Sequence, residues 1–252
     1  MKRILLTIEY DGTNFSGWQI QPEKRTVQGE LETVLTALFG EKITLKASGR
    51  TDAGVHALAQ KAHFDADFSI PTDKLCYAVN VRLPSDVAVR RAEEVPSDFE
   101  ARFSAKEKTY KYTFYFDKIT RPLIDRYAAR VAYDENKFNV EKAKIALKKI
   151  VGTHDFSAFS STGRPVSDAT RTIYAASLEK PDDAFSLTVT GNGFLYNMVR
   201  IIAGTIIEVG LGLIPETNVE LALRSPDRAL LGKTYPARGL CLTSVIYPNL
   251  LE

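Results

Sequence analysis

The stretch RILLTIEY, Arg3–Tyr10, decides the fold class, because its apolar residues recur with period two. The side chains that share one face are Ile4, Leu6, Ile8 and Tyr10. This alternation is typical of a strand with one buried face. Residues 11–25 contain two glycines and a proline, and this composition predicts a long loop after the strand.

The residues that follow predict a β-α-β-β-α-β unit. Apolar residues from Val27 to Leu38 follow helical spacing, with Thr26 as a candidate N-cap and Gly40 as a stop. Further strands are expected at 43–48, 58–65 and 86–94, and a short helix between Pro71 and Pro84. This order is that of a ferredoxin-like fold, in which helices cover one side of an antiparallel sheet.

The second half has a similar composition of elements. The run KEKTYKYTFYFD (106–117) is the clearest strand in the chain, since its aromatic residues alternate. The other expected elements are helices at 139–151 and 195–209, strands at 170–179, 184–191 and 240–247, and a short helix after Pro215. We therefore predict two α+β subdomains, 1–104 and 105–252, that share one sheet or pack closely.

Composition excludes several classes of protein. The formal net charge of the 252 residues is +2, which is not typical of a non-specific nucleic-acid coat but allows a local basic face. Two cysteines, Cys76 and Cys241, do not make a disulfide framework, and no CxxC pattern predicts a zinc site. Arg200 and Glu208 interrupt the longest apolar region, so a membrane span is not expected. The alternating N-terminal segment is not typical of a signal peptide, and we expect a cytoplasmic protein.

The stretch SGRTDAGVHA, Ser48–Ala57, contains the first candidate for chemistry. Asp52 is ionised at neutral pH and can act as a nucleophile or a base. It stands near glycines in a loop between two expected strands, where binding and catalytic residues are often found. An Asx-type turn with Arg50 as a surface partner explains the same residues about equally well. A metal pair with His56 is not favoured, because Gly54 lies in the turn between them.

The stretch FEARFSAKEKTYKY, 99–112, alternates aromatic and basic side chains. Bases stack on aromatic rings and phosphates attract cations, so this pattern indicates nucleic-acid binding. An amphipathic strand with a solvated lysine face is the alternative, and it applies best to the following Phe114 and Phe116. Tyr110 begins the strand, where a strand end can open into a cleft.

A third candidate is Arg200 in GNGFLYNMVR (191–200), in an otherwise apolar helix. A buried arginine needs a carboxylate or phosphate partner, and Asp52 is one candidate. A structural ion pair or an arginine that extends to the surface remains an equal alternative. The arginines at the two ends of 164–171 suit phosphates or an ordinary surface.

Taken together and in order, seven segments resemble the tRNA pseudouridine synthase A family. They are YDGTNFSGWQIQ, TVQGELE, SGRTDAGVHA, NVRLP, FEARFSAKEKTYKY, GNGFLYNMVR and PARGLCL. The resemblance implies two ferredoxin-like subdomains in an extended antiparallel sheet, with helices on one face and a central active-site cleft. It implies an isomerase, an intramolecular transferase that converts uridine to pseudouridine at positions 38, 39 and 40 of the tRNA anticodon arm. It also implies a homodimer, no metal or organic cofactor, no membrane and no other protein partner.

The resemblance also assigns roles to five residues. Asp52 matches the catalytic aspartate, and Arg50 the arginine that displaces and holds the flipped nucleotide. Tyr110 matches the tyrosine that stacks on the target base, Arg200 the arginine paired with the catalytic carboxylate, and Leu240 an apolar residue lining the uracil pocket. The rival interpretations are a non-catalytic RNA-binding module, which does not need Asp52, and an aspartate-based hydrolase, which does not need the basic and aromatic run.

Overall fold

The structure, a computed structural model, describes residues 1–67, 70–161 and 168–248. Contacts within the chain divide it into two compact units. Unit 1 comprises Met1–Lys106 and the segment that begins at Cys241, and unit 2 comprises Glu107–Leu240. Each unit contains helices and strands, which confirms the α+β class. The division of the chain into subdomains after residue 104 stays a prediction. That prediction placed the C-terminal strand in the second subdomain, whereas the segment from Cys241 belongs to unit 1.

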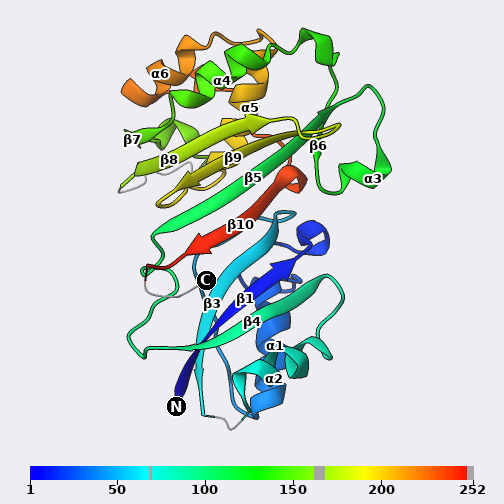
Figure 1. Cartoon of the computed structure of the whole chain (residues 1–252), viewed down its shortest axis with the longest axis vertical. Helices are drawn as coiled ribbons and strands as arrows, with labels where there is room; N and C mark the ends of the chain where they lie inside the picture. The colour runs from blue at the N-terminus through cyan, green and yellow to red at the C-terminus, as the bar shows by residue number, and fades with distance from the viewer. Residues whose placement is uncertain (68–69, 162–167, 249–252) are drawn as a thin grey trace. The chain divides into compact units, whose positions relative to one another are not determined.

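Unit 1 is a sheet with two helices on one face (Figure 1). Its elements are β1 (Lys2–Tyr10), α1 (Val27–Phe39), β2 (Lys46–Ala47), β3 (His56–Ala66), α2 (Thr72–Asn80), β4 (Val87–Val95) and, except for its first residue, β10 (Leu240–Ile246). Strand β1 lies between β4 and β3 and is antiparallel to both. Strand β2 pairs with β3 near His63, and β10 runs parallel to β3 near His56. The order of the elements along the chain is the predicted one. On the edge of β3 away from β1, β10 pairs with its first residues and β2 pairs with later ones.

The alternation in β1 puts the predicted side chains in the core, and Ile4, Leu6 and Ile8 have no exposed surface. Leu5 points to the opposite face and is also fully buried, opposite His63. His63 accepts a hydrogen bond from the amide of Ala101, so the segment around Ala101 covers this part of the second face. The strand is therefore buried on both faces here, and not on one face as its pattern predicts.

Both predicted ends of α1 are confirmed. The Thr26 hydroxyl accepts a hydrogen bond from the Gly29 amide at the N-terminus. Gly40 ends the helix in the left-handed conformation, with φ 70°, where a side chain would be strained. The strand predicted from residue 43 begins only at Lys46, because helix side chains bind the earlier amides. The amide of Leu45, for example, donates to Oε1 of Glu32 at 2.8 Å.

In unit 2 the strands have the order β5-β9-β8-β7 with antiparallel pairing, and a short parallel strand β6 lies beside β5. The strands are β5 (Glu107–Phe116), β6 (Ala129–Val131), β7 (Gly152–Asp155), β8 (Thr170–Glu179) and β9 (Phe185–Gly191). The helices are α3 (Pro122–Asp125), α4 (Val140–Lys148), α5 (Met198–Gly210) and α6 (Thr217–Arg224) (Figure 1). The short elements α3, β6 and β7 were not predicted.

The core of unit 2 is built on β5 and α5. Phe114 is fully buried and stacks on Phe185 with ring centroids 5.2 Å apart, and Phe116 packs on Phe138 at 5.0 Å. Helix α5 is apolar on most sides because eleven of its thirteen residues are buried. It begins at Met198 and not at residue 195 as predicted. Asn197 has a left-handed conformation with φ 61°, so no right-handed helix can run through this residue.

Candidate functional site

The loop that carries Asp52 joins β2 to β3, and its first residues are fixed to β3. The buried Ser48 hydroxyl donates to Oε1 of Gln60 at 2.8 Å, and the Ser48 amide donates to the carbonyl of Lys61 at 2.7 Å. The side-chain amide of Gln60 donates to the carbonyl of Gly49 at 3.0 Å. Gln60 itself has no exposed surface, so these bonds hold the start of the loop from inside the fold.

The loop after β1 holds the middle of the Asp52 loop. The amide of Trp18 donates to the carbonyl of Thr51 at 3.0 Å, and the amide of Gly54 donates to the carbonyl of Phe15 at 3.3 Å. The hydroxyls of Tyr10 and Thr51 share a buried hydrogen bond of 2.7 Å. The residue immediately before Asp52 is therefore held through both its carbonyl and its side chain.

Two glycines allow this close packing between the loops. A Cβ on Gly12 would lie 2.0 Å from the carbonyl oxygen of Val55, where no side chain fits. Gly17 has φ 92°, and a Cβ there would lie 2.7 Å from the carbonyl oxygen of Thr51. Sequence reasoning missed this role of residues 11–18, although the two glycines in the loop were the available signal.

Asp52 is half-buried, and Arg50 is exposed on the same loop. The turn that contains Asp52 is closed by its backbone, since the carbonyl of Asp52 accepts from the amide of Val55 at 3.1 Å. The positive φ of Gly54, 78°, completes the turn. A backbone hydrogen bond and a glycine with positive φ therefore close the turn that carries Asp52.

His56 links the two loops at the start of β3. Its Nδ1 accepts from the amide of Gly12 at 3.0 Å and lies 3.2 Å from Oδ1 of Asp11. An amide can only donate, so Nδ1 is an acceptor here and the ring proton lies on Nε2. Oδ1 of Asp11 accepts instead from the amide of Thr13 at 3.0 Å. His56 therefore has a structural role in this loop pair.

In unit 2, Tyr110 lies in β5 opposite Val189 of β9. Its side chain is 9% exposed, and its ring meets that of Phe194 edge to face, with centroids 5.1 Å apart. Such a contact fixes the orientation of an aromatic ring. Tyr110 is thus a pre-oriented ring with a small accessible surface.

Arg200 lies in the first turn of α5 and is half-buried. Its Nε donates to the carbonyl of Tyr235 at 2.7 Å, and its Nη1 donates to Oδ1 of Asn197 at 2.6 Å. These two hydrogen bonds orient the guanidinium. The left-handed Asn197, which shortens the helix, is also the residue that positions this arginine.

The segment before β10 supports Arg200 and Leu240. Gly239 packs against Tyr112 so closely that a Cβ would lie 2.7 Å from the ring. The Tyr112 hydroxyl donates to the carbonyl of Pro236 at 2.8 Å, and burial raises its pKa far above the usual range, so it stays protonated. Leu240 follows at the start of β10 and is 6% exposed. Only the PARGLCL resemblance indicated this segment in the sequence.

The predicted site residues therefore form two groups. Arg50 and Asp52 belong to unit 1, and Tyr110, Arg200 and Leu240 belong to unit 2. Buried hydrogen bonds hold the unit 1 group, and part-buried hydrogen bonds hold the unit 2 group. The pairing of Asp52 with Arg200 remains a prediction. In the segment 164–171, Arg171 is described, whereas the other arginine, Arg164, lies outside the described residues.

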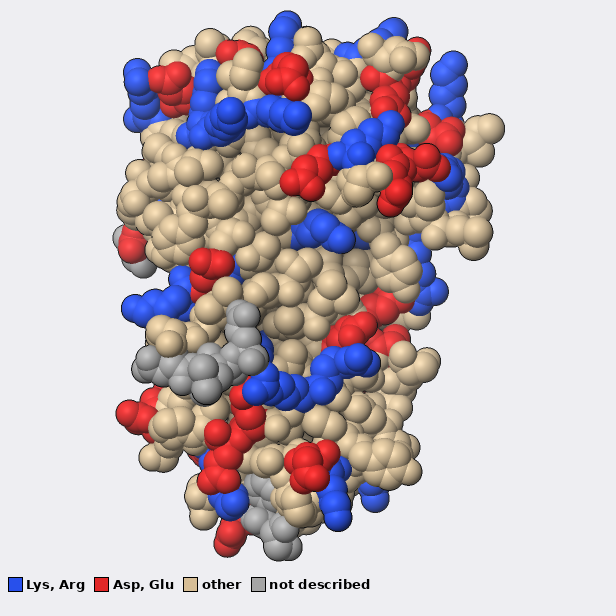
Figure 2. Space-filling model, in the orientation of Figure 1, with Lys and Arg blue, Asp and Glu red and all other residues tan. Residues whose placement is uncertain are grey.

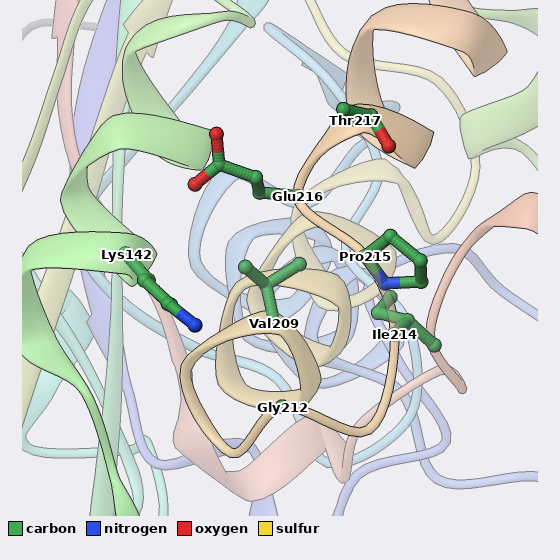
Figure 3. Close-up of a pocket in the computed structure, with 7 residues that line it drawn as sticks. All are labelled: Lys142, Val209, Gly212, Ile214, Pro215, Glu216 and Thr217. Carbon is green, nitrogen blue, oxygen red and sulfur yellow. The ribbon is translucent and has the colours of Figure 1, made fainter.

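Other features of the described residues do not add to these groups. A cavity of 420 Å³ lies between the start of α6, the end of α5 and Lys142 of α4 (Figure 3), and none of the predicted site residues lines it. On the face in Figure 2, Lys and Arg are interspersed with Asp and Glu. Within the described residues no group of three His, Cys, Asp or Glu side chains could hold a metal ion, and no helix is long and apolar enough to span a membrane.

Comparisons with known proteins give consistent matches along the chain. A family model described as tRNA pseudouridine synthase matches residues 6–104 and 146–248. The chain is 45% identical to tRNA pseudouridine synthase A of Caldicellulosiruptor saccharolyticus over 98% of this chain and all of that protein. It is also 45% identical to tRNA pseudouridine synthase A of Bacillus subtilis over the same shares.

Among solved structures, the chain is similar to one in a crystal structure of a Cbf5-Nop10-Gar1 complex, with a TM-score of 0.36 and 12% identity. The match covers 94% of this chain and 57% of that chain.

Proposed function

Because the chain belongs to the tRNA pseudouridine synthase A family, whose members isomerise uridine in tRNA, we propose that it modifies positions 38, 39 and 40 of the anticodon arm with Asp52 as the catalytic group. The observation that carries the assignment to Asp52 is its loop. The backbone closes the turn, buried hydrogen bonds hold both sides of it, and the carboxylate is half-buried within a glycine-rich stretch.

The reaction explains why this set of residue types is needed. The N1–C1′ bond must break, the uracil must rotate, and C5 must bond to C1′ in its place. The target nucleotide is stacked in a stem or loop, so it must first be extruded. In our proposal Arg50, which is exposed beside Asp52, holds the displaced nucleotide through its phosphate.

Asp52 then acts at the ribose. Its carboxylate either attacks C1′ and forms a covalent sugar ester, or removes the C2′ proton to give a glycal. In both routes the uracil leaves as an anion and rotates. C5 then bonds to C1′, either as the ester bond breaks and releases the Asp52 carboxylate or as Asp52 returns the proton to C2′ of the glycal. The C5 proton is finally lost to the Tyr110 hydroxyl or to water.

In our proposal the unit 2 residues bind the uracil base and stabilise the negative charge of Asp52. The ring of Tyr110, fixed edge to face by Phe194, is proposed to stack on the uracil while it rotates. Leu240 is proposed to line the pocket. Arg200 would keep Asp52 ionised, because a neighbouring positive charge lowers the pKa of a carboxyl group. The two hydrogen bonds that orient the guanidinium of Arg200 support this proposal.

The remaining expectations also stay proposals. We expect a homodimer, in which one tRNA contacts both copies, and a cytoplasmic location, because the substrate is tRNA. A non-catalytic RNA-binding module is the second candidate, but the full-length similarity to synthases disfavours it.

The test of position is tritium release from tRNA transcripts that carry [5-³H]uridine. Each transcript would carry uridine at only one of positions 38, 39 and 40, and a control transcript would carry none at these positions but retain uridine elsewhere. Release from the first three and none from the control is expected. Equal release from all four transcripts would show a tRNA pseudouridine synthase with a different target.

A further inference from the structure

The turn at residues 100–104 presents an aromatic ring to solvent on a well-anchored backbone. The amides of Phe103 and Ser104 both donate to the carbonyl of Glu100, at 3.0 and 2.8 Å. The Ser104 hydroxyl accepts from the Glu100 amide at 3.2 Å, which closes the turn a second time. This turn lies in FEARFSAKEKTYKY, whose pattern indicates nucleic-acid binding, but the residues of the turn have been given no individual role above.

The base of the turn is fixed inside unit 1. Ala101 has no exposed surface, its amide donates to Nδ1 of His63 at 3.2 Å, and its carbonyl accepts from the Tyr247 hydroxyl at 2.8 Å. The ring of Phe99 lies edge-on to Tyr247 at 4.9 Å, and its carbonyl accepts from Nη1 of Arg3 at 2.8 Å. The turn therefore projects Phe103 from a rigid support, with little conformational entropy left to lose on binding.

Phe103 is 80% exposed, although phenylalanine gains stability only when it is buried. The guanidinium of the exposed Arg102 lies 5.5 Å from the centre of the Phe103 ring. In the described part of the chain Arg102 forms no ion pair with a carboxylate. A single exposed apolar residue is ordinary. A ring with an adjacent free cation on a rigid turn is a different arrangement, because it matches the two halves of a nucleotide.

We propose that Phe103 is a stacking platform for an unpaired base of the tRNA, and that Arg102 binds the adjoining phosphate. The inference rests on tRNA being the substrate of this family. Unstacked bases of RNA loops stack on aromatic rings, and phosphates bind arginine side chains.

The charges around the turn favour this partner. The carboxylate of Glu100, the acidic residue of the turn, lies 3.2 Å from Nζ of Lys46 and 3.6 Å from Nη1 of Arg3. Arg3 also binds Asp65 at 2.7 Å, so Lys46 is the cation that mainly offsets the charge of Glu100 and reduces its repulsion of a phosphate at Arg102. The exposed Lys106 follows two residues after the turn and adds positive charge.

The test is the equilibrium binding of full-length variants to a fluorescently labelled tRNA transcript. Removal of a stacked ring in Phe103→Ala should weaken binding about fivefold to a hundredfold. Phe103→Leu keeps an apolar side chain without a ring and should lose as much. Phe103→Trp should bind within about twofold of the wild type, because it keeps a larger ring. Tyr77→Ala, at another exposed aromatic residue (76%) on α2, is the matched control and should bind as the wild type does.

Equal binding by the wild type and Phe103→Ala would overturn the proposal. So would normal binding by Phe103→Leu together with a loss in Phe103→Ala, since this pattern indicates an apolar contact. In that case sedimentation would show a change in oligomeric state, and the ring would belong to an interface between copies. Failure of the wild type to bind any tRNA would instead refute the function and, with it, this inference.

Discussion

The hydroxyl of Tyr10 is expected to control the position of Asp52, and Tyr10→Phe removes it without changing the ring. The Tyr10 and Thr51 hydroxyls lie 2.7 Å apart, and the two residues are 3% and 7% exposed. Tyr10→Phe leaves the Thr51 hydroxyl buried without this partner, which costs about 1–3 kcal/mol in the free energy of unfolding. Thr51→Val should cost a similar amount.

The double variant separates this bond from general effects of substitution. When both hydroxyls are replaced by apolar groups of similar shape, neither member of this hydrogen bond is left buried without the other. The double variant should therefore be less destabilised than the sum of the single variants by about 1–2 kcal/mol. Urea-induced unfolding of the four proteins measures this coupling.

Turnover should respond more than stability does. Thr51 precedes Asp52, and a displacement of about 1 Å at a catalytic group costs about 100-fold in rate. Tyr10→Phe should lower kcat by about 10- to 100-fold while KM for tRNA stays unchanged, because no phosphate contact is lost. Thr51→Ser keeps the hydroxyl and should retain most of the activity. Single effects that simply add in the double variant, or a wild-type kcat in Tyr10→Phe, would refute the reasoning.

Three further changes test other parts of the structure. Arg200→Ala removes two charged hydrogen bonds and should lower both turnover and the free energy of unfolding, the latter by about 1.5–3 kcal/mol per bond at most; unchanged urea unfolding would contradict this. Gly12→Ala would place a Cβ 2.0 Å from the carbonyl oxygen of Val55, so it should lower turnover and reduce the free energy of unfolding by about 1–3 kcal/mol. Gly40→Ala is the comparison, because Gly40 has open space around it but a φ of 70°. It should reduce the free energy of unfolding by about 1–2 kcal/mol and leave kcat unchanged. The hydrogen bond from Arg25 holds the pKa of Asp86 below its ordinary value of 3.8. The unfolded state therefore binds more protons near that pH, and the free energy of unfolding should fall as the pH drops below about 4. Arg25→Gln should remove this part of the pH dependence, which urea unfolding at several pH values measures.

Elements specified by local residues could be predicted from the sequence. Helix α1 has its signals at its own ends, in Thr26 and Gly40, and β8 was predicted at its observed bounds, 170–179. Elements that depend on distant partners could not. Residues 43–45 are apolar enough for a strand, but side chains of α1 bind their amides. The three residues of β6 form a strand only because β5 lies beside them.

The candidate site divides in the same way. Asp52, Tyr110 and Arg200 could be named from local motifs and the family resemblance. The hydrogen bonds that hold these residues in place could not be predicted, because the partners are far apart in the sequence. Tyr10 and Thr51 are separated by 41 positions, and Arg200 and Tyr235 by 35. Only the folded chain brings these pairs within hydrogen-bond distance.

The central claim is that the carboxylate of Asp52 performs the chemistry, and Asp52→Asn tests it most directly. The wild type and the variant would be compared in tritium release from tRNA carrying [5-³H]uridine, with tRNA affinity measured on the same samples. We predict release by the wild type, none by Asp52→Asn, and similar affinities, because phosphate contacts dominate binding. Release by Asp52→Asn at the wild-type rate would contradict the account.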